Sequence, residues 1–206
     1  MRRSRISQKR SISTTVIGTI HFLLLTAMFS VACVLSGCQS PKAVRQSENS
    51  AAQSTRNNCY SLLYQLLSEE KNVHLLLLIK REQNDVKILI KKISDASSTG
   101  AKLLEEFARK DPSIKLDDIR LPPGETATRE AIASTKKKEL LGRKGDEFER
   151  TLLLTQIQAL NYAWHLAKVA GENESQPERA SALAGLSKEM ENLHHEVFVL
   201  LLSKSK

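Results

Sequence analysis

The residues best suited to metal chemistry are one glutamate and two histidines near the C-terminus. Glu191 and His194 stand three positions apart, and His195 follows directly. Side chains three apart on a helix are neighbours, and carboxylate with imidazole is a common ligand pair for divalent metals. A dinuclear centre in a helical bundle also needs a second Glu-x-x-His on a facing helix. His165 is preceded at that spacing by Tyr162. We therefore expect at most a weak metal site at Glu191, His194 and His195, with no di-metal centre and no cofactor.

The apolar pattern around these residues places them at the edge of a predicted core. Residues at alternating spacings of three and four are apolar: Leu183, Leu186, Met190, Leu193, Val197 and Leu200. This pattern predicts a helix whose apolar seam packs against other helices. His194 lies at the flank of that seam, and Glu191 lies further toward solvent. A histidine at the core edge is therefore favoured over a metal ligand.

Two other reactive groups lie in an earlier segment. Glu70 and His74 are four residues apart, which predicts an ordinary side-chain pair on one helix face. Cys59 is followed by Tyr60, Leu62 and Leu63, so we expect a buried and unreactive thiol there. An intermolecular disulfide through Cys59 is the alternative.

The N-terminus has the pattern of an export signal. Its basic residues, with no acid among them, are Arg2, Arg3, Arg5, Lys9 and Arg10. Residues 16–35 are mostly apolar. The following Leu35-Ser36-Gly37-Cys38 resembles the lipobox of bacterial lipoproteins, in which the cysteine thiol accepts a diacylglycerol. Cys33 lacks the leucine three places upstream. We expect residues 1–37 to be a lipoprotein signal peptide and Cys38 to be lipidated; a signal anchor over residues 16–35 is the alternative.

Charge and the residue after Cys38 bear on location and partners. Gln39 is not the aspartate that resembles an inner-membrane retention signal, so we expect a lipid-anchored envelope protein, on the outer membrane facing the periplasm in a Gram-negative host. Removal of the signal lowers the net charge from +8 to +3, because five basic residues leave with it. That small charge argues against nucleic-acid binding. The cluster Lys136-Lys137-Lys138 is expected to be a solvated helix face, with a phosphate or lipid-headgroup contact as the alternative.

The exported part is expected to be all-α. Aromatic residues make up 4% of the chain, and there are 8 glycines and 5 prolines, which disfavours an all-β fold. Residues 38–56, rich in Ser, Gln and Asn, are expected to carry the lipidated cysteine on a flexible tether. Residues 57–203 are predicted to form an antiparallel four-helix bundle, with an additional short helix at 126–141 between the second and third long helices.

Local signals place the helix boundaries. The first helix is expected over 57–81, with the apolar run 75–79 buried more completely than the rest. Asn84 or Asp85 is expected to cap the second helix. Capping boxes are expected to open the third helix at Asp146 with Glu149 and the fourth at Ser175 with Glu178. Gly100, inside the second helix, predicts a close helix crossing.

The chain resembles the exported ferritin-like "domain of unknown function" family of bacterial envelope proteins, of outer-membrane-protein type. Three segments carry the resemblance: Asn84-Asp85-Val86-Lys87, Ile93-Ser94-Asp95 leading into Leu103 and Ala108, and Gly145-Asp146-Glu147-Phe148-Glu149. A histidine in the last helix, His194 or His195, fits as well. Where the family carries histidines in the second and third helices, this chain has Ala96 and Leu160. The resemblance spans residues 75–202 and implies a ferritin-like bundle without a complete metal site.

Two classes of function remain at this level. No phosphate-binding loop or nucleophile elbow is present in the sequence, so we expect a protein that is not an enzyme. The favoured role is a membrane-anchored lipoprotein whose bundle binds an unknown envelope protein partner or serves a structural purpose. The alternative is a ferritin-like metal-binding protein with a degenerate site that involves a histidine of the last helix.

Overall fold

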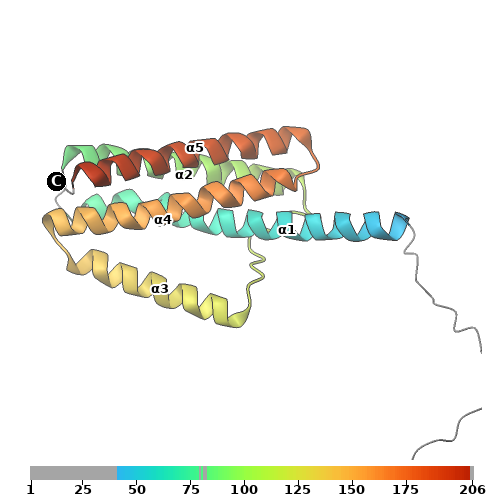
Figure 1. Ribbon diagram of the computed structural model, residues 1–206, viewed down its shortest axis with the longest axis horizontal. Coiled ribbons are helices and arrows are strands. Elements are labelled where there is room, and N and C mark those ends of the chain that lie inside the picture. The colour runs from blue at the N-terminus through green and yellow to red at the C-terminus, as the bar shows by residue number, and fades with distance from the viewer. Residues whose placement is uncertain (1–40, 79, 81–82, 205–206) are drawn as a thin grey trace, which may run out of the picture. The chain divides into compact units, whose positions relative to one another are not determined.

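Runs of leucine, alanine, lysine and glutamate, with no proline between residues 42 and 111, favour helix over any other backbone state. The computed structural model describes residues 41–78, 80 and 83–204, and every regular element in them is helical, which confirms the all-α expectation (Figure 1). The elements in chain order are α1 Pro41–Glu70, the 3₁₀ helix η1 Val73–Leu78, α2 Asn84–Lys110, α3 Pro123–Gly142, α4 Gly145–Glu172 and α5 Pro177–Ser203.

Helices α1, α2, α4 and α5 pack in a closed ring of pairs: α1 on α2, α2 on α5, α5 on α4 and α4 on α1. Contacts along α1 and α4 show that this pair is antiparallel. Tyr60 near the middle of α1 meets Glu174 just past the end of α4, whereas Glu70 at the end of α1 meets Gln156 inside α4.

Helices α2 and α5 are antiparallel as well. Asp85 in the first turn of α2 pairs with Lys204 just after α5, and Lys92 one to two turns further pairs with Glu196. These helices lie within the compact unit Gln39–Lys206, which holds all of the buried core that the structure describes. Among the described helices, none combines the length and the apolar character needed to cross a membrane.

The core lies where the apolar periodicity predicts it. On α5 the seam residues Leu183, Leu186, Met190, Leu193 and Val197 are all buried, and Leu200 is half-buried. On α2 the predicted face is buried around Ile90, Ile93 and Leu104. The close crossing expected at Gly100 is confirmed: a Cβ there would lie 2.9 Å from Cδ1 of both Leu67 and Leu186.

The flexible tether expected over residues 38–56 needs correction, because α1 already begins at Pro41. The segment up to residue 56 is polar and has no apolar period. Near residue 56, however, contacts with the rest of the fold hold the helix in place. Arg56 is 5% exposed, and its Nη1 lies 3.5 Å from Oε1 of Glu174. A charged residue in this segment is therefore part of the fold.

The first helix also ends earlier than expected. Helix α1 stops at Glu70 and the chain continues as η1, whereas the sequence predicted one helix to residue 81. In η1 only Val73 is buried, while Leu75 and Leu78 are 48% and 78% exposed. A run of adjacent apolar residues points in all directions around a helix, so one packing surface cannot cover it.

The expected capping side chains do not cap. Helix α4 begins after Lys144 without a side-chain cap, and Glu149 instead accepts a hydrogen bond from the backbone N–H of Gln83, 2.5 Å away. Helix α5 begins after Gln176, also without a side-chain cap, with Pro177 in its first turn. Helix α2 likewise starts after Gln83 and not at a capped Asn84. Of the expected capping residues, Glu149 and Asp85 make contacts between elements instead, both with Lys204.

Candidate functional site

The predicted metal residues on α5 are not brought together as a ligand set. Oε2 of Glu191 accepts a hydrogen bond from Nζ of Lys188 at 2.8 Å, and the two form a surface ion pair. The ring of His194 lies 6.2 Å from the ring of Trp164, and His195 is exposed. Across residues 41–78, 80 and 83–204, no cluster of three His, Cys, Asp or Glu side chains has a geometry that could hold a metal ion.

The expected pairing of Glu70 with His74 is wrong. Helix α1 ends at Glu70, so the helical spacing between them is lost. Nδ1 of His74 lies 2.7 Å from Oγ of Ser94 and 3.2 Å from the carbonyl oxygen of Lys71. Ser94 is 4% exposed, so this contact joins η1 to α2 in the interior and leaves the hydroxyl out of reach of a substrate.

The cysteines divide between the described and the undescribed parts of the chain. Cys59 is buried, as expected, and burial raises the pKa of its thiol above the usual range, which disfavours the reactive thiolate. Cys38 and its lipobox residues Leu35, Ser36 and Gly37 lie outside the described residues, so their assignment stays a prediction.

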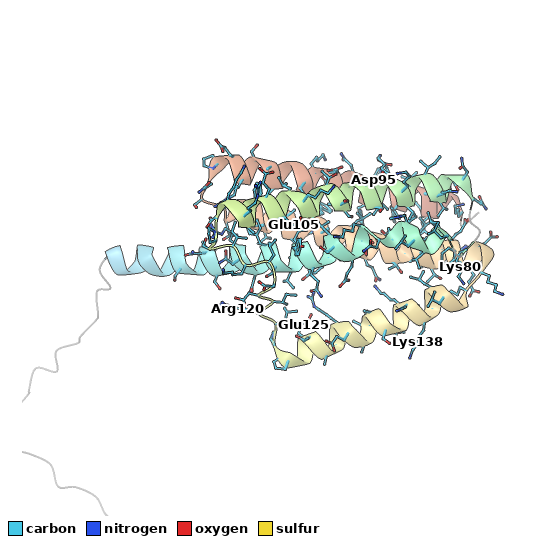
Figure 2. All side chains as sticks on the ribbon, turned by 180° about the vertical axis from the view of Figure 1, so that it is seen from behind. Lys80, Asp95, Glu105, Arg120, Glu125 and Lys138 are labelled. Carbon is cyan, nitrogen blue, oxygen red and sulfur yellow. The ribbon has the colours of Figure 1, made fainter. Side chains whose placement is uncertain are left out.

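A large hollow among the described residues lies beneath α3. This helix runs outside the other four helices and follows α4 over part of its length (Figure 1, Figure 2). Only Leu140 of α3 is buried, so the helix does not pack closely along its length. Between α3 and the surface formed by α1, η1 and α4 lies a groove of about 960 Å³, which we call the α3 groove.

Long side chains hold α3 over the groove. Nη2 of Arg129 donates to Oη of Tyr162 on α4 at 3.0 Å, and the guanidinium lies 5.0 Å from the centre of that ring. Nζ of Lys136 donates to Oε1 of Gln158, also on α4. These contacts leave space beneath the helix because the connecting groups are at the ends of extended side chains.

The ammonium group of Lys80 binds the C-terminal end of α3. Nζ of Lys80 donates to the carbonyl oxygens of Leu141 at 2.6 Å and Arg143 at 2.9 Å (Figure 2). The last carbonyls of a helix have no partner within it and attract positive charge, so this contact stabilises the end of α3. Lys138 lies on the side of α3 away from the other helices and is exposed, as expected of a solvated face (Figure 2).

The walls of the α3 groove are mainly apolar. From α1 and η1 come Leu66, Val73 and Leu76; from α3 come Ile132, Ala133 and Leu140; from α4 come Leu152 and Ala159. Ile132 is 49% exposed although it lines the hollow. An apolar hollow with few polar groups is the usual form of a site for a small ligand.

Two polar side chains meet among the lining residues of the groove. Nε2 of Gln156 donates to Oε2 of Glu70 at 2.8 Å. Gln156 is 1% exposed, and its Oε1 has no hydrogen-bond partner among the described residues. Burial raises the pKa of the Glu70 carboxyl; the hydrogen bond from Gln156 and the charge of Lys136 partly oppose this, and the charge of Glu69 adds to it. The groove therefore contains a poorly solvated carboxyl group beside an unused carbonyl oxygen.

Sequence reasoning found Glu70 but gave it the wrong partner, and it did not find Gln156 or the groove. Gln156 sits 86 positions from Glu70, and no local pattern links them. The segment 126–141, predicted only as an additional short helix, is polar in composition, and this is the one local signal that bears on the groove.

Comparison of this chain with protein-family models, with curated proteins and with solved structures gives no match. The assignment of a function therefore depends on the sequence pattern of the N-terminus and on the geometry of the groove.

Proposed function

We propose that this chain is a lipid-anchored bacterial envelope lipoprotein whose helical ectodomain has a non-enzymatic binding role. The observation that carries the anchor is Leu35-Ser36-Gly37-Cys38 at the end of an acid-free basic and then apolar leader. An acyl chain contributes about 0.8 kcal/mol of membrane affinity per buried methylene, so several chains on Cys38 are enough for stable attachment. Gln39 at the next position favours the outer membrane in a Gram-negative host.

The proposed ectodomain is an up-down four-helix bundle of ferritin-like type, with α3 as an addition. Support comes from the ring of pairwise contacts among α1, α2, α4 and α5 and from the short connection between α4 and α5. The family resemblance stated above points the same way. In such a bundle the family's histidine positions are occupied here by Ala96 and Leu160, both buried and apolar.

Binding is favoured over a purely structural role because the α3 groove is a preformed hollow whose lining combines apolar side chains with several polar and charged ones, among them the pair Glu70 and Gln156. A helix that served only to complete the core would bury more than Leu140. The envelope partner, protein or small molecule, is proposed to bind in the α3 groove.

The experiment that tests the anchor is mass spectrometry of the mature N-terminus after extraction from membranes. We expect an acylated Cys38 followed by Gln39. A chain that retains Arg2 to Arg10 would favour the signal-anchor alternative. Replacement of Cys38 by Ser is expected to move the protein from the membrane to the soluble envelope fraction or to leave the precursor unprocessed; the same replacement at Cys33 serves as the matched control and is expected to change neither.

A partner is sought by co-purification from envelope extract. Protein captured by wild type but not by a variant whose groove is filled, Ala159→Trp, would support a role for the groove. Equal capture by both would place the partner on another surface.

A further inference from the structure

Gln156 is one of the residues that line the α3 groove, and its side chain carries a buried hydrogen-bond acceptor without a partner. Its Nε2 is occupied by Glu70, while Oε1 has no partner among the described residues although the residue is 1% exposed. A buried acceptor without a donor is costly, and nearly all such groups in folded proteins are satisfied. Gln156 lines the groove, so a molecule bound there can supply the missing donor.

The neighbouring carboxyl group of Glu70 favours a hydrogen-bond donor that carries a positive charge. Glu70 is half-buried and receives one hydrogen bond, from a neutral amide, and the nearby charge of Lys136 only partly offsets the effect of burial on its carboxyl group. A carboxylate accepts several hydrogen bonds, and those from a cation are the strongest. One ammonium group has three N–H donors and can therefore serve both Glu70 and Oε1 of Gln156.

The rest of the groove requires an apolar body. Leu66, Val73 and Leu76 on one wall and Ile132 on the opposite wall offer no hydrogen bonds to a bound chain. The volume of about 960 Å³ exceeds what a few water molecules fill, because each water takes up about 30 Å³ in the liquid. A hydrocarbon chain or ring system of lipid or drug size fits such a space.

We infer that the α3 groove binds an apolar molecule that carries a primary ammonium group, with the ammonium held by Glu70 and by Oε1 of Gln156. This inference rests on the binding role proposed above and names the chemical class of its ligand. It does not depend on the lipid anchor, because the groove lies entirely within the unit Gln39–Lys206.

Of the three basic side chains of α3 that line the groove, Arg129, Lys136 and Lys137, the first two are already engaged by other side chains, which disfavours an anion site. Arg129 is already paired with Glu125, whose Oε1 lies 2.7 Å from its Nε, and it also stacks on Tyr162. Lys136 donates to Gln158.

The test compares three probes with the same ten-carbon chain: decylamine, decanoate and decanol. Each is titrated calorimetrically into residues 39–206, the unit that contains the whole described core, at about pH 7.5, where an alkylamine is protonated. We expect decylamine to bind roughly tenfold or more tightly than the other two, because only it pairs with both acceptors. Equal or tighter binding of decanoate or decanol, or no binding of decylamine, would overturn the inference.

Variants assign the effect to the groove. Glu70→Gln is expected to weaken decylamine binding by roughly tenfold or more and to leave decanol unchanged, because the side chain keeps its size and loses its charge. The control Glu106→Gln removes an exposed carboxylate on α2 and is expected to change nothing. Gln156→Met, which removes the unused carbonyl, is a second variant that should also weaken decylamine selectively. Thermal unfolding by circular dichroism checks that each variant is folded, and undiminished decylamine affinity in both groove variants would refute the assignment.

A pH series provides an independent readout. The charged groups that face Glu70 are Glu69 on its own helix and Lys136 on α3; Glu125, Arg129 and Lys137 also line the groove. Decylamine is expected to bind wild type less tightly as the pH falls through the raised pKa of Glu70, because the protonated carboxyl no longer attracts a cation. Glu70→Gln is expected to lose that dependence. If the pH dependence persists in Glu70→Gln, another of these groups holds the ammonium and the inference fails.

Discussion

Arg179 and Glu174 face each other as a two-point ion pair at the junction of α4 and α5. Nε of Arg179 lies 3.0 Å from Oε2 of Glu174, and its Nη2 lies 3.0 Å from Oε1. The glutamate side chain is fully buried and also accepts a hydrogen bond from Oη of Tyr60 at 2.8 Å. Nη1 of Arg179 also lies 2.9 Å from Oδ2 of Asp111 just after α2, so Arg179 and Glu174 together connect the end of α2, the junction of α4 with α5, and Tyr60 within α1.

Replacement of Arg179 by alanine is expected to destabilise the protein by about 3 kcal/mol, because it removes the two-point partner of a buried carboxylate and leaves only the longer contact of Glu174 with Arg56 to compensate the charge. The measurement is the free energy of unfolding in urea. Arg120→Ala, which breaks the exposed pair with Asp118, is the matched control and is expected to change it very little. Similar losses of unfolding free energy in the two variants would show that the buried ion pair contributes no more stability than the exposed one.

Acid is expected to weaken the same network. Burial alone would raise the pKa of Glu174, but hydrogen bonds from Arg179, from the backbone N–H of Gln176 and from Tyr60 outweigh it and lower the pKa. The folded pKa thus lies below the unfolded value of about 4.3, so the stabilisation is present above that pH and is lost as the pH falls through the folded pKa. Stability measured from about pH 6 to 3 should therefore fall less steeply in Glu174→Gln than in wild type.

The contribution of Glu70 to the pH dependence of stability should have the opposite sign to that of Glu174. The folded pKa of Glu70 lies above the unfolded value, so folding favours the protonated form and stability declines as the pH rises through the folded pKa. Glu70→Gln is therefore expected to have a higher Tm than wild type at about pH 7.5 and the same Tm near pH 4. A lower Tm at neutral pH would show that the charge of Glu70 stabilises the unliganded fold.

Two glycine substitutions separate packing from helix propensity. Gly100→Ala is expected to destabilise by about 1 kcal/mol, because the new Cβ lies 2.9 Å from Leu67 and Leu186 and the cost of moving them exceeds the gain in propensity. Gly185→Ala, on the exposed side of α5 with nothing within 4 Å, is expected to stabilise by up to about 1 kcal/mol. Thermal unfolding of both variants measures the difference, and stabilisation by Gly100→Ala would contradict the tight crossing.

Protein purified without added metal is expected to contain no tightly held pair of iron, manganese or zinc ions. Elemental analysis of wild type and His194→Ala provides the measurement. Two ions per chain, lost together in the variant, would favour the metal-binding alternative.

The sequence by itself determined the helices and their inward faces. Spacings of three and four along α5 identified Leu183, Met190 and Val197 as core, and all three are fully buried. The same holds for the crossing at Gly100 and for the thiol of Cys59, which lies in an apolar stretch. These features depend on neighbours within a few turns, and the helical repeat makes that information local.

Only the tertiary structure decided which polar groups meet. Tyr60 and Glu174 are 114 positions apart, and nothing near either residue predicts their hydrogen bond. Glu149 stands where it could cap its own helix, but it contacts Gln83 and Lys204 instead, and nothing in the neighbouring sequence predicts these two partners. The α3 groove arises in the same way: α3 is held by the ends of long side chains, and the space beneath it depends on the distance between helices.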